Sequence, residues 1–217
     1  MTVAHHPTDE TLMRHAAGTL GAAPAIVVGA HLSVCPQCRD SVRTFEALGG
    51  AVLDDIEPTD LAPEALDKVL ARIDAESENE AGAGRPDQPV MLDGVSLPIS
   101  LRGCEIRRWR WIGPGIHMSR VGVPQDSKAN LILLKVGPGR ALPDHGHFGT
   151  EFTYIVSGSY TDALGRFAAG DIAEVDDHVE HQPIVDPDGE CICLAAIEGK
   201  MRFNSIIGRL LQPIFGI

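Results

Sequence analysis

The chain has 217 residues, a hydrophobic content of 44%, a charged content of 22% and a formal net charge of −12. This length suits one large or two small domains, and the composition is that of a soluble globular protein. The acidic balance argues against direct nucleic-acid binding, because phosphates would be repelled. No run of 18 apolar residues is present, and the first residues lack a basic start and an apolar core, so neither a membrane span nor a signal peptide is expected.

The acidity is concentrated in the first part of the chain. Residues 1–80 carry 14 acidic and 5 basic side chains, and residues 81–217 carry 16 and 13. Such a surface is compatible with docking on a basic protein, for instance one that itself binds DNA. A solvated acidic face is the alternative interpretation.

The first 75 residues are predicted to form a small helical bundle. Thr8 is placed to cap a helix over residues 9–17 that Gly18 ends. Two further helices are expected, each with a proline in its first turn, and the second of them is expected to end at a pair of glycines. These two helices cover residues 24–32 and 36–48. A fourth helix over residues 63–75 carries one apolar stripe, formed by Leu66, Val69, Leu70 and Ile73.

The joint between the second and third helices contains His31, Cys35 and Cys38 in the spacing H-x3-C-x2-C. A helix N-terminus favours negative charge, so both thiols are expected to be biased toward the thiolate that binds metal. Two sulfurs and one imidazole need one more ligand for a tetrahedral zinc site, and His5 and His6 are the available residues. A redox dithiol would call for a preceding strand. Unliganded core cysteines are the remaining alternative.

This arrangement resembles the zinc-binding anti-sigma domain over residues 1–75. The resemblance implies a helical domain that wraps a zinc ion and masks an extracytoplasmic-function sigma factor from RNA polymerase. It also implies that His6, rather than His5, is the fourth ligand. His15, on the first helix, is interpreted as a packed or solvated histidine.

Residues 76–89 are rich in Glu, Gly, Ala and Pro and are predicted to form a flexible linker. The remaining residues, 90–217, contain short β-like runs separated by turn residues, which is typical of a sandwich or barrel. These runs cover residues 105–112, 130–136, 152–157, 166–167, 172–175 and 191–196. The apolar segment 202–215 is expected to pack against the barrel or the helical domain.

The stretch GRALPDHGHFGTEFTYIVSG, residues 139–158, contains three side chains spaced to hold one metal ion. His145 and His147 lie two residues apart and share a face of an extended strand. Glu151 follows Gly149, where the chain can turn, and His181 is positioned to add a fourth ligand from a neighbouring strand. Imidazole and carboxylate together suit zinc, manganese, iron or copper.

These residues resemble the two cupin motifs. Every defined position of the first motif is filled, by Gly139, His145, His147, Glu151 and Gly158, whereas the second motif is matched only by Gly170 and His181. The resemblance implies a cupin fold. Near the end of this region Cys191 and Cys193 share one face of a strand. They are interpreted as buried structural thiols, with redox sensing as the alternative.

The helical zinc domain followed by a cupin resembles the ChrR-type anti-sigma factors over nearly the whole chain. The resemblance implies a cytoplasmic, non-enzymatic regulator that binds one sigma factor and releases it under singlet oxygen or related oxidants through its cupin domain. It also implies two zinc ions per chain. The first would be held by His6, His31, Cys35 and Cys38, and the second by His145, His147, Glu151 and His181. Four protein ligands leave little room for substrate at the second ion.

The alternative function is that of a metal-dependent cupin enzyme, such as a dioxygenase or isomerase, with a helical docking domain. Three histidines and one glutamate around iron or manganese also serve such enzymes. Metal analysis separates the two, because two zinc ions per chain favour the regulator and iron in the cupin favours the enzyme.

Overall fold

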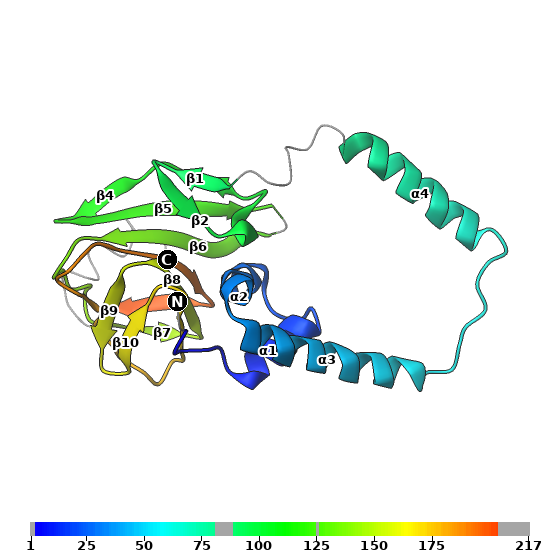
Figure 1. Ribbon diagram of the computed structural model, residues 1–217, viewed down its shortest axis with the longest axis horizontal. Helices are drawn as coiled ribbons and strands as arrows, with labels where there is room; N and C mark the ends of the chain where they lie inside the picture. Colours follow the sequence, from blue (N-terminus) through cyan, green and yellow to red (C-terminus); the bar gives the residue numbers. More distant parts are fainter. Residues whose placement is uncertain (1–2, 81–88, 125, 204–217) are drawn as a thin grey trace.

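The computed structural model describes residues 3–80, 89–124 and 126–203, with the backbone alone at 76–80, 147 and 200–203. Helices occupy the first part of the described chain and strands the second (Figure 1). The helices are α1 (Asp9–Ala16), α2 (Ala22–Val34), α3 (Pro36–Asp54) and α4 (Ala65–Glu80). This arrangement confirms the predicted α + β class, with a helical N-terminal unit and a β-rich C-terminal unit.

Local signals explain where the first three helices begin and end. The Thr8 hydroxyl accepts a hydrogen bond from the Thr11 amide at the start of α1, and Gly18 follows the helix with a φ of +67°. Cys35 closes α2 and opens α3, and Pro36 occupies the first turn of α3. The two cysteines of the motif therefore lie at and just inside a helix N-terminus, as predicted.

Two helix ends differ from the prediction. Helix α3 continues through Gly49 and Gly50 to Asp54 instead of ending at the glycine pair. Both glycines keep negative φ values, so each costs helix stability of about 1 kcal/mol relative to alanine but still makes its backbone hydrogen bond. Helix α4 continues to Glu80, so residues 76–80 of the expected linker are helical. The rest of that segment, residues 81–88, lies outside the described part of the chain.

The strands of the C-terminal unit form one large antiparallel sheet and smaller sheets beside it. The large sheet has the order β11-β8-β13-β6-β5-β3, and β4 also pairs with β5. Its strands are β3 (Glu105–Ile106), β4 (Arg110–Gly113), β5 (Ile116–Val123), β6 (Asp126–Val136), β8 (Glu151–Ser157), β11 (Ile172–Val175) and β13 (Cys191–Ile197). The smaller sheets contain β9 (Ser159–Asp162), β10 (Gly165–Ala168) and β12 (Ile184–Val185), then β7 (His145–Phe148) with β14 (Lys200–Phe203), and β1 (Val90–Leu92) with β2 (Val95–Leu97).

The predicted strand segments are recovered within a few residues, except that residues 105–112 are divided between β3 and β4. The sequence analysis missed β5, because its run IHMSRVGV mixes polar and apolar residues without a regular period. The short strands β1, β2, β9, β12 and β14 were also missed, whereas β7 corresponds to the extended strand expected around His145 and His147. The C-terminal segment beyond residue 203, predicted to pack on the barrel, lies outside the described residues.

Alternate side chains of the large sheet face two different environments. On β13, Cys191 and Cys193 pack toward the smaller sheets, whereas Leu194 and Ala196 pack toward α2. All seven residues of β13 are therefore buried. Strand β8 follows the same alternation, with Ile155 directed inward and Phe152 directed toward the helix. The large sheet is thus shared between the interior of the cupin and the contact with the helical unit.

Helix α2, with the sequence AAPAIVVGAHLSV, provides that contact. It has no Asp, Glu, Lys or Arg, and Val27, Val28, Ala30 and His31 are completely buried. A helix without a charged face is buried on several sides. Figure 1 shows α2 between the sheet and helices α1 and α3. None of the helices in the described part of the chain combines the length and the hydrophobicity needed to cross a membrane.

Candidate metal centres

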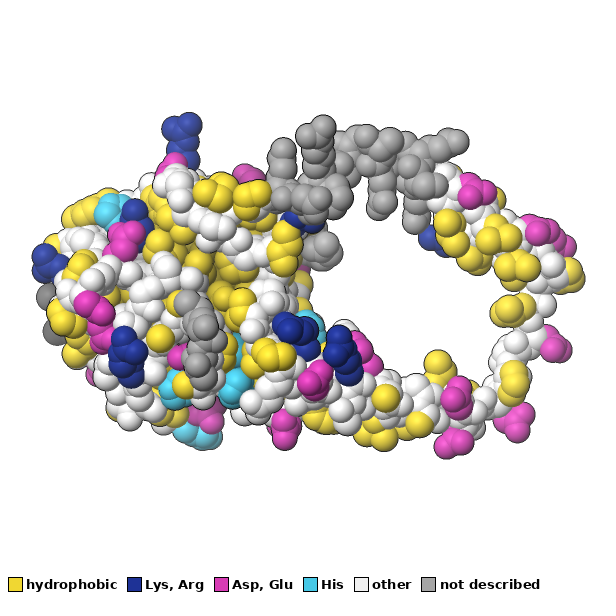
Figure 2. All heavy atoms as spheres, viewed as in Figure 1, with side chains coloured by type: hydrophobic (Ala, Val, Ile, Leu, Met, Phe, Trp, Pro, Cys, Tyr) yellow, Lys and Arg dark blue, Asp and Glu magenta, His cyan; other side chains and the backbone are white. Residues whose placement is uncertain are grey.

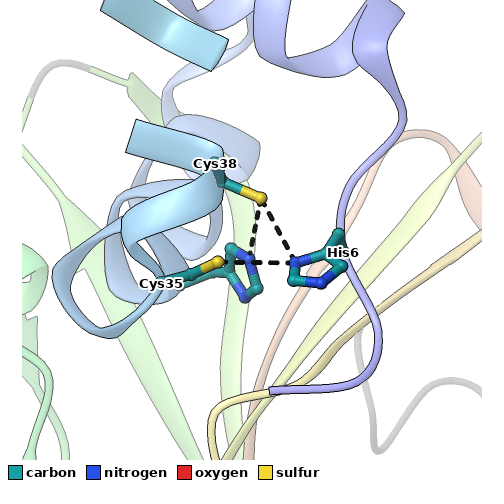
Figure 3. Close-up of side chains that lie close together, drawn as sticks. His6, Cys35 and Cys38 are labelled. Carbon is teal, nitrogen blue, oxygen red and sulfur yellow. Dashed lines mark hydrogen bonds between the residues drawn. The ribbon is translucent and has the colours of Figure 1, made fainter. Parts of the chain in front are cut away.

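The first cluster of metal-binding side chains lies where the N-terminal segment meets the joint between α2 and α3. His6 Nδ1 is 3.4 Å from Cys35 Sγ and 3.3 Å from Cys38 Sγ, and His31 Nε2 is 3.3 Å from Cys38 Sγ. One ligand atom from each of these four residues lies within 4.8 Å of the others. Figure 3 shows the two sulfurs and the His6 ring directed at one point.

These separations fit a tetrahedral zinc ion. Zn–S distances near 2.3 Å and Zn–N distances near 2.0 Å place sulfur and nitrogen ligands about 3.5 Å apart. The observed distances of 3.3–3.4 Å match that geometry without rearrangement. The structure thus brings together the four residues His6, His31, Cys35 and Cys38, with a donor set that zinc prefers.

The cupin unit orients one of these ligands. His31 Nδ1 donates a hydrogen bond to the Gly170 carbonyl oxygen, 2.9 Å away, in the turn before β11. With its proton on Nδ1, the ring directs the lone pair of Nε2 toward Cys38. A carbonyl partner of this kind sets the tautomer and ring orientation of a metal-binding histidine. His31 has 0% exposure, so no water replaces this contact.

The structure separates the two adjacent histidines of the N-terminal segment. His5 packs on the Phe167 ring, with ring centroids 4.2 Å apart, and its Nε2 lies 3.0 Å from the Arg166 carbonyl oxygen. The Asp171 carboxylate accepts the backbone amides of Ala4 and His5 at 2.7 and 3.1 Å. The chain is therefore held so that His6, and not His5, reaches the cysteines.

Burial opposes the ionisation of one of the two thiols. Burial raises the pKa of Cys38 to about 12, and a hydrogen bond that its thiol donates to the neighbouring Cys35 adds to the shift. The helix N-terminus, which was expected to favour the thiolate, is outweighed by this desolvation. A cation at the cluster would favour the thiolate form of Cys38, because it would balance the buried negative charge.

The second cluster lies inside the cupin unit. It contains His145 from β7, Glu151 from β8 and His181 from the segment between β11 and β12. All three residues are buried, with 4%, 8% and 3% of their surface exposed. His145 Nε2 is 3.8 Å from Glu151 Oε2, and the backbones of His145 and His181 form an isolated β-bridge. The side chain of His147 lies outside the described residues, so its predicted role stays a prediction.

Hydrogen bonds orient all three side chains of this cluster. His145 Nδ1 lies 2.7 Å from the Pro143 carbonyl oxygen, and His181 Nδ1 lies 2.9 Å from Asp162 Oδ2. The Thr153 hydroxyl donates to Glu151 Oε1 at 2.7 Å. His145 thereby turns its Nε2 toward Glu151, and the hydrogen bond of His181 Nδ1 leaves its Nε2 as the nitrogen that could bind a metal. Although burial lowers the pKa of His145, the hydrogen bond and charge of Glu151 raise it overall.

Two glycines of the stretch 139–158 have backbone roles. Gly149 has a φ of +116°, and a side chain there would overlap the Glu198 carbonyl oxygen. Gly158 has a φ of +75°, and a side chain there would overlap the Glu190 carbonyl oxygen. Only glycine suits both positions. The first makes the turn that brings Glu151 beside His145.

Cys191 and Cys193 lie near this cluster and face the interior of the cupin. Both are free thiols, 2% and 6% exposed. Burial raises the pKa of Cys191 to about 12, with the charge of Asp186 adding to the shift, and burial raises that of Cys193 well above its usual value. Both side chains are therefore neutral thiols at physiological pH.

Sequence reasoning missed the residues that connect the two units. Gly170, Asp171 and Glu174 have their partners in the helical unit, 139 to 167 residues away along the chain. Gly170 was noted only as a position of the second cupin motif. No short-range pattern marks these residues, because their roles depend on how the helical unit lies on the cupin.

Comparison with known proteins places the chain beside one group of regulators. Residues 103–199 match the family model of the ChrR cupin-like domain. The chain is 38% identical to the anti-sigma-E factor ChrR of Cereibacter sphaeroides over 220 residues, which cover all of both proteins. It is also similar to a crystal structure of Rhodobacter sphaeroides SigE in complex with the anti-sigma ChrR, with a TM-score of 0.74 and 33% identity over 91% of this chain and 100% of that chain.

Proposed function

The chain belongs to the ChrR family of anti-sigma factors, and from this premise we propose that it binds one extracytoplasmic-function sigma factor and releases it under singlet oxygen or related oxidants. In this proposal residues 1–75 bind and inhibit the sigma factor, and residues 90–217 control its release. The relative of known structure was crystallised with SigE, which supports a sigma factor as the partner of this chain. The proposal places the protein in the cytoplasm, where sigma factors act.

An exposed apolar strip on the helical unit carries this proposal. It is formed by Leu48, Val52, Leu53, Ile56, Leu61, Leu66, Val69, Leu70 and Ile73, whose exposures range from 49% to 81%. Figure 1 shows α4 apart from the rest of the described chain, and Figure 2 shows an open space between α4 and the end of α3. Apolar patches of this extent mark binding surfaces for other proteins.

The charge of this strip fits a basic partner. Acidic residues lie among its apolar side chains, including Asp54, Asp55, Glu57 and Asp67. A sigma factor presents basic DNA-binding surfaces, so an acidic clamp with apolar contacts would cover a surface that it needs for transcription. The first four-residue cluster would fasten α2 to α3 and so determine the direction in which the strip projects.

The sigma-binding proposal is tested by placing charges in the strip. Leu66→Asp with Leu70→Asp is expected to weaken binding to the cognate sigma factor at least 100-fold, because two apolar contacts are replaced by charges that must be desolvated. Candidate sigma factors are co-expressed with the full chain, co-purified and assayed for transcription. Met91→Asp, on an exposed residue of β1, is the matched control and should bind as the unchanged protein does.

Normal sigma binding by the double variant would show that α4 is not the docking surface. Failure of every candidate sigma factor to co-purify with the unchanged chain would contradict the function itself. Metal analysis gives an independent result, since iron in place of zinc in the cupin would favour the metal-dependent enzyme.

The contacts between the units support the release step. The Glu174 carboxylate accepts hydrogen bonds from the Thr8 amide, the Thr8 hydroxyl and the Thr11 hydroxyl at 2.8–3.0 Å. The Ile172 amide donates to the His5 carbonyl oxygen. Together with Gly170 and Asp171, these contacts make β11 and the turn before it the support for α1 and the first metal cluster.

The same strand reaches the second cluster. Val175 at the end of β11 lies opposite Glu151 at the start of β8, and Ile172 lies opposite Tyr154. A change at the second cluster that moves β8 would therefore move β11, and with it the groups that hold His6 and His31. Zinc has no redox chemistry, so in this proposal the oxidant acts on ligands, nearby thiols or a bound small molecule.

A further inference from the structure

The cupin interior contains a cavity to which the proposed function assigns no ligand. Its volume is about 230 Å³, and it lies between the inner face of the large sheet and the smaller sheets. An apolar cavity of about 150 Å³ already admits a benzene ring. This cavity is therefore large enough for a small organic molecule.

The cavity exists because small side chains line one wall. On β13 the inward positions are occupied by Cys191, Cys193 and Ala195, opposite Ile132 and Leu134 on β6. Three small residues in succession leave the centre unfilled, whereas a packed core would place larger side chains there. Most of the remaining lining is aliphatic or proline, so the cavity favours an apolar occupant.

The polar lining groups gather on one side of this cavity. His145, Glu151 and His181 line it, and Thr153 beside them has its hydroxyl engaged by Glu151. Asp162, whose side chain has 0% exposure, lies behind His181. The carboxylates of Glu151 and Asp162 would balance the charge of a divalent cation held at this wall, so a further anion would be buried without compensation.

The least buried lining residues lie in the turn between β4 and β5 and in the segment before β7, so we take the entrance to be at this end of the cavity. Pro114 is exposed, and Ile112, Leu142 and Pro143 are half-buried, while most of the other lining residues are buried. A molecule entering between them would meet aliphatic side chains along its length and the histidines at its head.

From this arrangement we propose that the cupin cavity binds a small uncharged apolar molecule, an aliphatic chain with a single neutral polar group such as a hydroxyl, with that group directed at His145, Glu151 and His181. This ligand-binding proposal does not depend on whether the helical unit binds a sigma factor.

Titration calorimetry of the zinc-loaded full chain with straight-chain primary alcohols tests this. From butan-1-ol upward, the affinity is expected to rise about fourfold with each added methylene, as burial of a CH₂ group predicts, until the chain outgrows the cavity. Octanoate, with the same chain length and a negative charge, is expected to bind at least tenfold more weakly than octan-1-ol.

Ala195→Leu fills the cavity and is expected to weaken octan-1-ol binding at least tenfold. Ala163→Leu, the same change at an exposed turn of the cupin, should leave it unchanged. Leu134→Phe, at a half-buried lining position, is a second cavity-filling variant. It tests the cavity as the binding site if Ala195→Leu fails to fold.

Unchanged alcohol binding in a folded filling variant would place the site elsewhere and overturn the proposal. Tighter binding of octanoate than of octan-1-ol would overturn the uncharged class, and no binding by the full chain would overturn the site. Co-purification of the sigma factor is measured on the same preparations. Because it does not depend on alcohol binding, it shows separately whether the proposed function fails.

Discussion

The two buried histidine clusters of this protein are held in different ways. The first joins three segments of the helical unit, and its His31 and the chain before His6 are held by hydrogen bonds that they donate to Gly170 and Asp171 of the cupin. The second lies wholly within the cupin, on strands that pair with one another and around a backbone bridge. A metal at the first cluster would therefore hold separate segments together, whereas a metal at the second would occupy a framework that is hydrogen-bonded without it.

Removing a sulfur of the first cluster is expected to have the largest effect. Cys38→Ala should unfold much of residues 1–75, because a structural zinc site contributes on the order of 10 kcal/mol to the folding of a small metal domain. The expected result is loss of helical circular dichroism, loss of one zinc per chain and release of the sigma factor.

Cys104→Ala is the control, since this half-buried thiol lies outside both clusters. If Cys38→Ala kept its helical content and its sigma affinity, metal binding at the first cluster would not be what stabilises the helical unit.

An intermediate effect is expected at the second cluster. Glu151→Gln keeps the shape of the side chain but removes its charge, so the cupin should lose its metal while the strands stay paired. Zinc should fall from two to one per chain, sigma inhibition should persist, and release by photosensitised singlet oxygen should be abolished.

Zinc analysis and transcription assays with and without the photosensitiser measure these outcomes. Glu190→Gln, an exposed carboxylate of the same unit, should behave as the unchanged protein. Loss of sigma binding in Glu151→Gln would contradict the division between a binding unit and a releasing unit.

The smallest effect is expected for the contacts between the units. Asp171→Asn with Glu174→Gln weakens the acceptors for the N-terminal segment and α1 while leaving every predicted ligand in place. Mutating the hydrogen-bond partners that orient metal ligands typically lowers metal affinity 10- to 100-fold. Zinc binding at the first site should therefore weaken about tenfold.

Competition with a chromophoric chelator measures that affinity, and Asp188→Asn with Glu190→Gln is the matched control on exposed residues. Equal zinc affinities for the two double variants would show that the cupin does not support the first cluster.

Local patterns were sufficient for much of the fold. Thr8, Gly18, Pro24 and Pro36 place the ends of helices to within a few residues, because capping depends on immediate neighbours. The glycine pair at 49 and 50 misled the prediction, since a glycine ends a helix reliably only where the chain takes a positive φ. Strand β5 was missed because its polar residues are buried or half-buried by partners on both sides.

The amino-acid sequence by itself determined the donor types and their spacing: the H-x3-C-x2-C joint, the histidines around Gly146, and the glycines that only a tight turn accepts. These features are local, since they depend on residues that share one turn, one strand or one helix end. The tertiary structure alone decided that His6 rather than His5 meets the cysteines and that Asp162 stands behind His181. It also decided that the cupin supports the first cluster through β11. Those contacts join residues far apart in the chain, and only the packing of α2 against the large sheet brings them within hydrogen-bonding distance.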